Sequence, residues 1–137
     1  MNEKTIINST AAIGGTVLTC LIGGWDSALG VLAILIIVDY LTGLTKGFKS
    51  GTLSSSIGYN GLIKKIGIFV AIIVAHQLDM ASGMNPPIFR TLAVYFYIGN
   101  EGLSVLENLA ILGIPLPNAL KEGFEKIEGA NDGRKVG

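Results

Sequence analysis

The chain has 137 residues, of which 50% are hydrophobic and only 15% charged, and its mean hydropathy is +0.58. Water-soluble domains of this size do not normally have such a composition, so lipid is the expected solvent. Ten Lys and Arg residues balance ten Asp and Glu residues, which gives no support for a nucleic-acid partner. The single cysteine, Cys20, excludes an intrachain disulfide and a Cys-rich metal site.

Helix-length apolar windows dominate the chain. A helix needs about 20 mostly apolar residues to cross about 30 Å of hydrocarbon. Asn8, Ser9 and Thr10 dilute the first window, which could instead lie in the membrane interface. The last window follows the pair Pro86-Pro87, which suits a helix start. The sequence predicts an all-α protein of membrane-spanning helical hairpins, with four transmembrane helices over residues 6–24, 28–45, 66–84 and 88–109.

The segment 46–65 between the second and third windows is positively charged and contains no acidic residue. Positive residues are enriched in cytoplasmic loops, so this segment is expected inside the cell. Four helices then put both termini in the cytoplasm, whereas three spans and an interfacial first segment would put the N-terminus outside. The lysines expected to anchor the loop are Lys46, Lys49, Lys64 and Lys65.

Residues 118–128 predict a short amphipathic helix, because Leu120, Phe124 and Ile127 recur at helical spacing between charged residues. Such a helix could lie on the inner membrane surface or pack on neighbouring subunits. We expect a transmembrane domain over residues 1–116 and a cytoplasmic region over 117–137, with a flexible tail from Gly129.

Small residues recur every four positions along the first window, at Ala11, Gly15, Thr19 and Gly23. A stripe of this kind lets a second helix approach closely, which indicates helix association between subunits. The alternative is that the same face packs within one subunit.

Several polar residues fall inside the predicted spans. A charged side chain at the bilayer centre costs roughly 2.5–3.5 kcal/mol, so these groups must face protein or water. His76 and Glu101 are both expected near the bilayer midplane, where they could pair. The set could hold a compact bundle together, line a pore or assembly surface, or relay protons or ions. Its members are Asp39, His76, Asp79, Asn100, Glu101, Ser104 and Glu107.

Nothing in the sequence indicates an enzyme or a cofactor. His76 and Asp79 lie three positions apart, but a lone histidine with scattered carboxylates is a poor zinc site. No phosphate-binding glycine loop and no nucleophile arrangement accompany them. We therefore expect no metal and no catalytic residue.

From the second window onward, the chain resembles the phage holin family that includes the holin of pneumococcal phage Cp-1 and the clostridial toxin-secretion holin TcdE. The resemblance rests on DYLTG at 39–43, KSGTLSSSIG at 49–58, GLIKK at 61–65, the pair His76 and Asp79, and NEGLSVLEN at 100–108, followed by GIPLP at 113–117. The first window has no counterpart in this resemblance, and members often have three spanning helices. The order and spacing of these pieces carry the resemblance.

The resemblance implies a protein that oligomerises in the bacterial cytoplasmic membrane and opens lesions, with an endolysin or a secreted toxin as its functional partner. It names no catalytic residue. Two alternatives remain at this point: a small ion or proton channel or transporter, and a non-conducting antiholin that binds and delays a holin.

Overall fold

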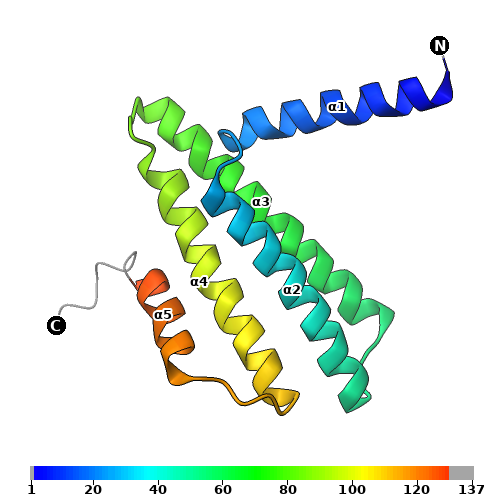
Figure 1. The fold of residues 1–137 in the computed structure, drawn as a ribbon. Coiled ribbons are helices and arrows are strands. Elements are labelled where there is room, and N and C mark those ends of the chain that lie inside the picture. The colour runs from blue at the N-terminus through cyan, green and yellow to red at the C-terminus, as the bar shows by residue number, and fades with distance from the viewer. Residues whose placement is uncertain (1, 130–137) are drawn as a thin grey trace.

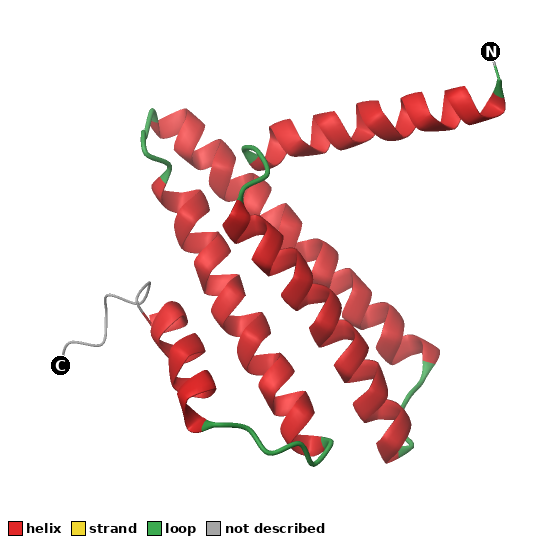
Figure 2. Ribbon diagram, in the orientation of Figure 1, coloured by secondary structure: helices red, strands yellow, loops and turns green. Residues whose placement is uncertain are grey.

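The computed structural model describes residues 2–129, and all of its regular structure is helical within that range (Figures 1 and 2). The all-α prediction is confirmed. The helices are α1 (Glu3–Ile22), α2 (Ser27–Ser50), α3 (Ser55–Ser82), α4 (Ile88–Ile111) and α5 (Asn118–Gly129).

Helix ends follow the capping residues of the sequence. The Asp26 side chain accepts the Leu29 N–H at 2.8 Å at the start of α2, and Ser54 accepts the Ile57 N–H at 3.2 Å at the start of α3. Gly51 ends α2 at φ +70°, in the left-handed region that favours glycine. Because these caps are close together, only residues 51–54 form the loop for which the sequence indicated 46–65. Most of the lysine-rich segment is helical.

Three helices, α2, α3 and α4, form the bundle that contains the core (Figure 1). Leu29, Leu32 and Ile72 are fully buried, and Val94 of α4 is 1% exposed. α1 projects away from this bundle, and only the C-terminal part of α1 contacts α3 (Figure 1). α5 lies along α4, and α2 lies on the other side of α4 (Figure 1).

Among the described helices, α1, α2 and α3 are long and apolar enough to cross a membrane. α4 has the length, 24 residues, but is not among these three, since it carries Arg90, Glu101 and Glu107. It nevertheless packs along both α2 and α3. Four spans thus remain a prediction, and three of the described helices are apolar enough to span a membrane.

The predicted amphipathic helix is present as α5, and its apolar side covers α4 of the same chain. Phe124 and Ile127 pack against the core of the bundle. A Cβ atom at Gly102 would lie 2.3 Å from the Phe124 ring, and one at Gly99 would lie 2.8 Å from the Glu128 Cβ. The absence of a side chain at Gly99 and at Gly102 thus allows α5 to pack closely on α4. The tail expected beyond Gly129 lies outside the described residues.

We expect Gly102→Ala to loosen α5, because the added methyl group overlaps the Phe124 ring and overpacking of this kind costs about 1–3 kcal/mol. Amide hydrogen exchange over residues 118–129 measures the effect. Gly67→Ala is the matched control, since nothing lies within 4 Å of a Cβ atom at that position. Equal protection of α5 in the two variants would contradict this packing.

Candidate functional site

A buried ion cluster joins α2, α3 and α4 in the middle of the bundle. The Lys65 ammonium donates to Asp39 and, at 2.5 Å, to the Glu101 carboxylate. The side chains of Asp39 and Glu101 are 9% and 3% exposed, so lysine replaces the water that each carboxylate loses. The Asn108 amide donates to Asp39 Oδ1 and to Thr42 Oγ1, both at 3.0 Å. One residue from α3 therefore sets the register of the other two helices.

His76 and Glu101, which the sequence suggested could pair, do not do so in this structure, because Glu101 binds Lys65 instead. Lys65 was expected as a loop anchor, but it lies within α3 and its long side chain reaches inward. The imidazole of His76 lies beside Gly23 and Arg90, and its buried Nδ1 has no hydrogen-bond partner in the described part of the chain.

A second polar cluster, the Arg90 clasp, joins the start of α4 to the turn between α1 and α2. Arg90 is 5% exposed. Its guanidinium donates at 2.7 Å to the carbonyl oxygens of Ile22 and Gly24 and to the Asp26 carboxylate. The planar guanidinium of arginine can donate to several acceptors at fixed angles, which the single ammonium group of lysine cannot do. The clasp fixes the only described connection between α1 and α2.

No sequence pattern singled out Arg90, because its partners are mostly backbone carbonyl oxygens. Partial burial raises the pKa of the Asp26 carboxyl, but the Leu29 N–H and the Arg90 guanidinium outweigh it and hold that pKa below its usual range. The contribution of Asp26 to stability is thus present near neutral pH and is lost as the pH falls through the lowered pKa.

Asp79 belongs to the same end of the bundle. Its carboxylate accepts the backbone N–H groups of Phe89 and Arg90, each at 2.8 Å, and so satisfies the free donors at the start of α4. Its exposed fraction is 2%. Asp79 therefore ties α3 to α4, a structural role, and does not face a lumen in this subunit.

The polar residues of α4 point in two directions. Glu101 and Asn108 face inward and are buried, whereas Asn100 and Glu107 are exposed. Ser104 is half-buried and lines a cavity between the helices. The helical spacing in the sequence brings these residues near one another but does not tell which of them meet α2 and α3.

The small stripe of α1 also divides. Ala11 and Gly15 are exposed, and nothing lies within 4 Å of a Cβ atom at Gly15. Thr19 bonds the Gly15 carbonyl of its own helix at 2.7 Å. Gly23 ends α1 with φ +89°, and a Cβ atom there would lie 2.6 Å from His76 Nδ1. Gly23 is therefore a helix cap packed within the subunit.

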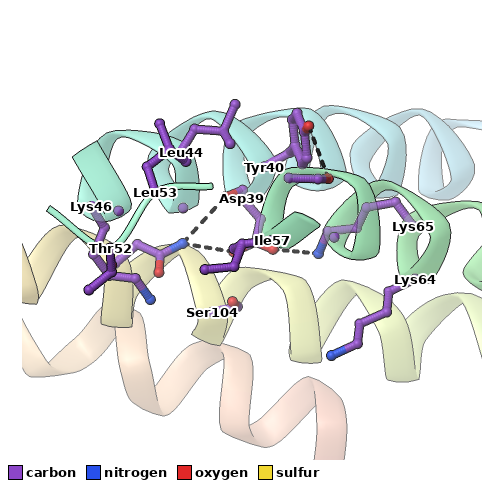
Figure 3. Close-up of a pocket in the computed structure, with 15 residues that line it drawn as sticks. Asp39, Tyr40, Leu44, Lys46, Thr52, Leu53, Ile57, Lys64, Lys65 and Ser104 are labelled. Atoms are coloured by element: carbon purple, nitrogen blue, oxygen red, sulfur yellow. Dashed lines mark hydrogen bonds and ion pairs between the residues drawn. The ribbon is translucent and has the colours of Figure 1, made fainter. Parts of the chain in front are cut away.

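The remaining lysines of the expected anchor set lie around the 51–54 loop. Lys49 donates to the Leu112 carbonyl at 3.1 Å and so links α2 to the end of α4. Lys46 and Lys64 line the same cavity as Ser104, and their side-chain ammonium groups make no hydrogen bond or ion pair with the described residues (Figure 3). No group of three potential metal ligands occurs among residues 2–129.

These features define an integral membrane helical bundle with buried polar clusters and a polar outer helix. The bacteriophage holin family model matches residues 16–129, and the chain belongs to this family, whose members are non-enzymatic membrane proteins that act in lysis. It is membrane-embedded, in agreement with its apolar helices.

Relatives in curated collections cover most of the chain. An uncharacterized protein of Clostridium perfringens strain 13 is 44% identical over 118 residues, which are 86% of this chain and 87% of the relative. A protein of Bacillus phage phi105 named "Probable holin" is 36% identical over 104 residues, 76% of each chain. A Bacillus subtilis protein, uncharacterized YqxH, is 37% identical over 108 residues, 78% of this chain and 76% of the relative. No solved structure matches significantly.

Replacing Lys65 by methionine leaves Asp39 and Glu101 buried without their counter-charge. Breaking a buried pair in this way costs about 3–5 kcal/mol, so the thermal midpoint of the protein in detergent should fall sharply. Lys121→Met serves as the control, because Lys121 is 69% exposed and its 3.9 Å contact with Glu125 contributes little. Equal midpoints for the two variants would show that the cluster does not hold the bundle.

Arg90→Lys keeps the charge but cannot preserve all three contacts of the guanidinium. Each lost hydrogen bond to a charged group costs about 1.5–3 kcal/mol. Backbone amides over residues 22–29 should then exchange faster with solvent and the turn should become sensitive to protease. Unchanged exchange in that segment would mean that the clasp does not restrain the turn.

Proposed function

We propose that this chain is a holin that oligomerises in the bacterial cytoplasmic membrane and opens lesions through which an endolysin or a toxin leaves the cytoplasm. Family membership supports the holin role. The structural observation that supports lesion formation is the packing of α5 along α4, which adds a charged surface to one side of the bundle.

The depth of α5 follows from its contact with Gly99. Gly99 lies 11 residues after Ile88, which corresponds to about 16 Å along α4. The Glu128 backbone nitrogen lies 3.0 Å from a Cβ atom at Gly99. If about 30 Å of hydrocarbon begins at the start of α4, the last turn of α5 reaches its middle.

The outward side of α4 and α5 is polar, and we call it the polar face. Charged groups at this depth are costly against lipid, so this face requires water or another polar surface. The outer sides of α2 and α3 are apolar instead, with Ile34 63% exposed and Val74 62% exposed, and suit lipid. The polar face consists of Asn100 and Glu107 of α4 and Lys121, Glu122, Glu125 and Lys126 of α5, all exposed.

In an assembly, the polar faces of several subunits would enclose water while α2 and α3 face lipid. The stripe of Ala11 and Gly15, both exposed, and the half-buried Thr19 supplies the close helix contact between subunits. The buried residues Asp39 and Asp79 hold each subunit together. Gly23 is not part of the proposed contact between subunits, because it packs within its own subunit.

The orientation that fits this arrangement puts the 51–54 loop in the cytoplasm and, with α1 as a further span, the N-terminus as well. Lys46 lies about 28 Å along α2 from Ser27, and Lys64 about 27 Å along α3 from Ser82. These lengths agree with the thickness of the hydrocarbon. Trp25, 59% exposed at the other end of the bundle, suits the outer interface.

Expression in a bacterium that also produces an endolysin tests the holin role. We expect loss of membrane potential, arrest of growth and escape of the endolysin to the cell wall. Loss of potential without escape would favour an ion channel. Survival with normal potential, at verified membrane levels, would overturn the holin role, and delay of a co-expressed holin would then identify an antiholin.

Cysteine reactivity tests the polar face separately, in a Cys20→Ser background. The thiolate reacts and forms only where water is present. In everted membrane vesicles, Glu125→Cys should react rapidly with a membrane-impermeant maleimide, and Ile34→Cys should not. Slow reaction at both positions would place α5 against lipid and contradict the proposed lumen.

A further inference from the structure

The cavity beside the ion cluster has features of a ligand site that the holin role does not require. It has a volume of about 360 Å³ and lies between the C-terminal half of α2, the N-terminal half of α3 and Ser104 of α4 (Figure 3). We propose that it binds the phosphate headgroup of an anionic phospholipid in the inner leaflet.

Charge is the first argument for this ligand. Three lysines line the cavity, and Lys65 is already held by Asp39 and Glu101. The ammonium groups of Lys46 and Lys64 have no partner among the described residues, and in Figure 3 their side chains lie on either side of Ser104. Two unpaired ammonium groups at one cavity attract a phosphate and disfavour a cation.

Hydrogen-bonding capacity is the second argument. The Ser104 hydroxyl is half-buried, lines the cavity and makes no hydrogen bond with the described residues. By contrast, the Tyr40 hydroxyl of the same lining is occupied, since it donates to the Gly58 carbonyl at 3.2 Å. Ser104 is therefore free to donate to a phosphate oxygen or to accept from a headgroup hydroxyl.

Depth and lining identify the source of the phosphate as lipid. Lys46 and Lys64 lie about 27–28 Å from the outer ends of their helices, at the level where inner-leaflet headgroups begin. Tyr40 and Leu44 line the side of the cavity nearer the bilayer interior and suit the start of an acyl chain, whereas a free phosphate ion gains nothing from them. Basic pockets between membrane helices on the cytoplasmic side are suited to anionic headgroups.

Lipid binding by the full-length protein in neutral detergent tests the proposal. We expect phosphatidylglycerol to raise the thermal midpoint and to remain bound in native mass spectra, and phosphatidylcholine to do so much less. Inorganic phosphate at matched concentration is the third arm. If phosphate alone reproduced the effect of phosphatidylglycerol, the lipid assignment would be overturned.

Single variants locate the site. Lys46→Gln and Lys64→Gln should each weaken phosphatidylglycerol binding about fivefold, and Ser104→Ala, which leaves the charge unchanged, by a similar factor. Lys4→Gln and Ser9→Ala on α1 are the matched controls and should leave binding unchanged, because both residues are exposed and remote from the cavity. Equal binding by the cavity variants and their controls would overturn the proposal. The readout is independent of lesion formation, so failure here leaves the holin role untouched.

Discussion

Lys65 is the residue on which the middle of this bundle depends. A charge inside a membrane helix must find an opposite charge or water, and here one ammonium serves carboxylates from two other helices. This requirement holds α2, α3 and α4 in one register, although they share few large buried side chains. Once that register is set, Lys46, Lys64 and Ser104 come to surround one cavity, and Gly99 and Gly102 come to face α5.

Hydropathy, glycines and prolines were sufficient to predict the presence of the described helices and the all-α fold, because apolar windows and breaks are local properties. They did not predict that α3 begins at Ser55, where Ser54 caps it, rather than at residue 66. Contacts were harder to predict. A lysine side chain is long and flexible, so the position of the residue in the sequence does not identify its partner. For this reason Lys65 was predicted to be a loop anchor. Arg90 binds carbonyl oxygens, which no sequence pattern marks. Gly99 and Gly102 could have been noticed as a small face on α4 opposite the apolar residues of the last helix.

The subunit has one apolar and one polar side. This asymmetry explains why α4 is less apolar than α2 and α3. Helices that face lipid on their outer sides must be apolar there, as Ile34 and Val74 are. A helix covered by α5 on one side and by the bundle on the other is released from that demand. Its polar residues can then point inward to the ion cluster or outward to the polar face. A mean hydropathy for the whole helix does not distinguish these two directions.

The Arg90 clasp has a consequence for what α1 can contact. The clasp holds the end of α1 and the following turn through the carbonyl oxygens of Ile22 and Gly24, and α1 otherwise touches the bundle only near its own C-terminal end. Within one subunit α1 is therefore held at one end, and the surface of residues 3–15, including Ala11 and Gly15, is left for contacts outside the subunit.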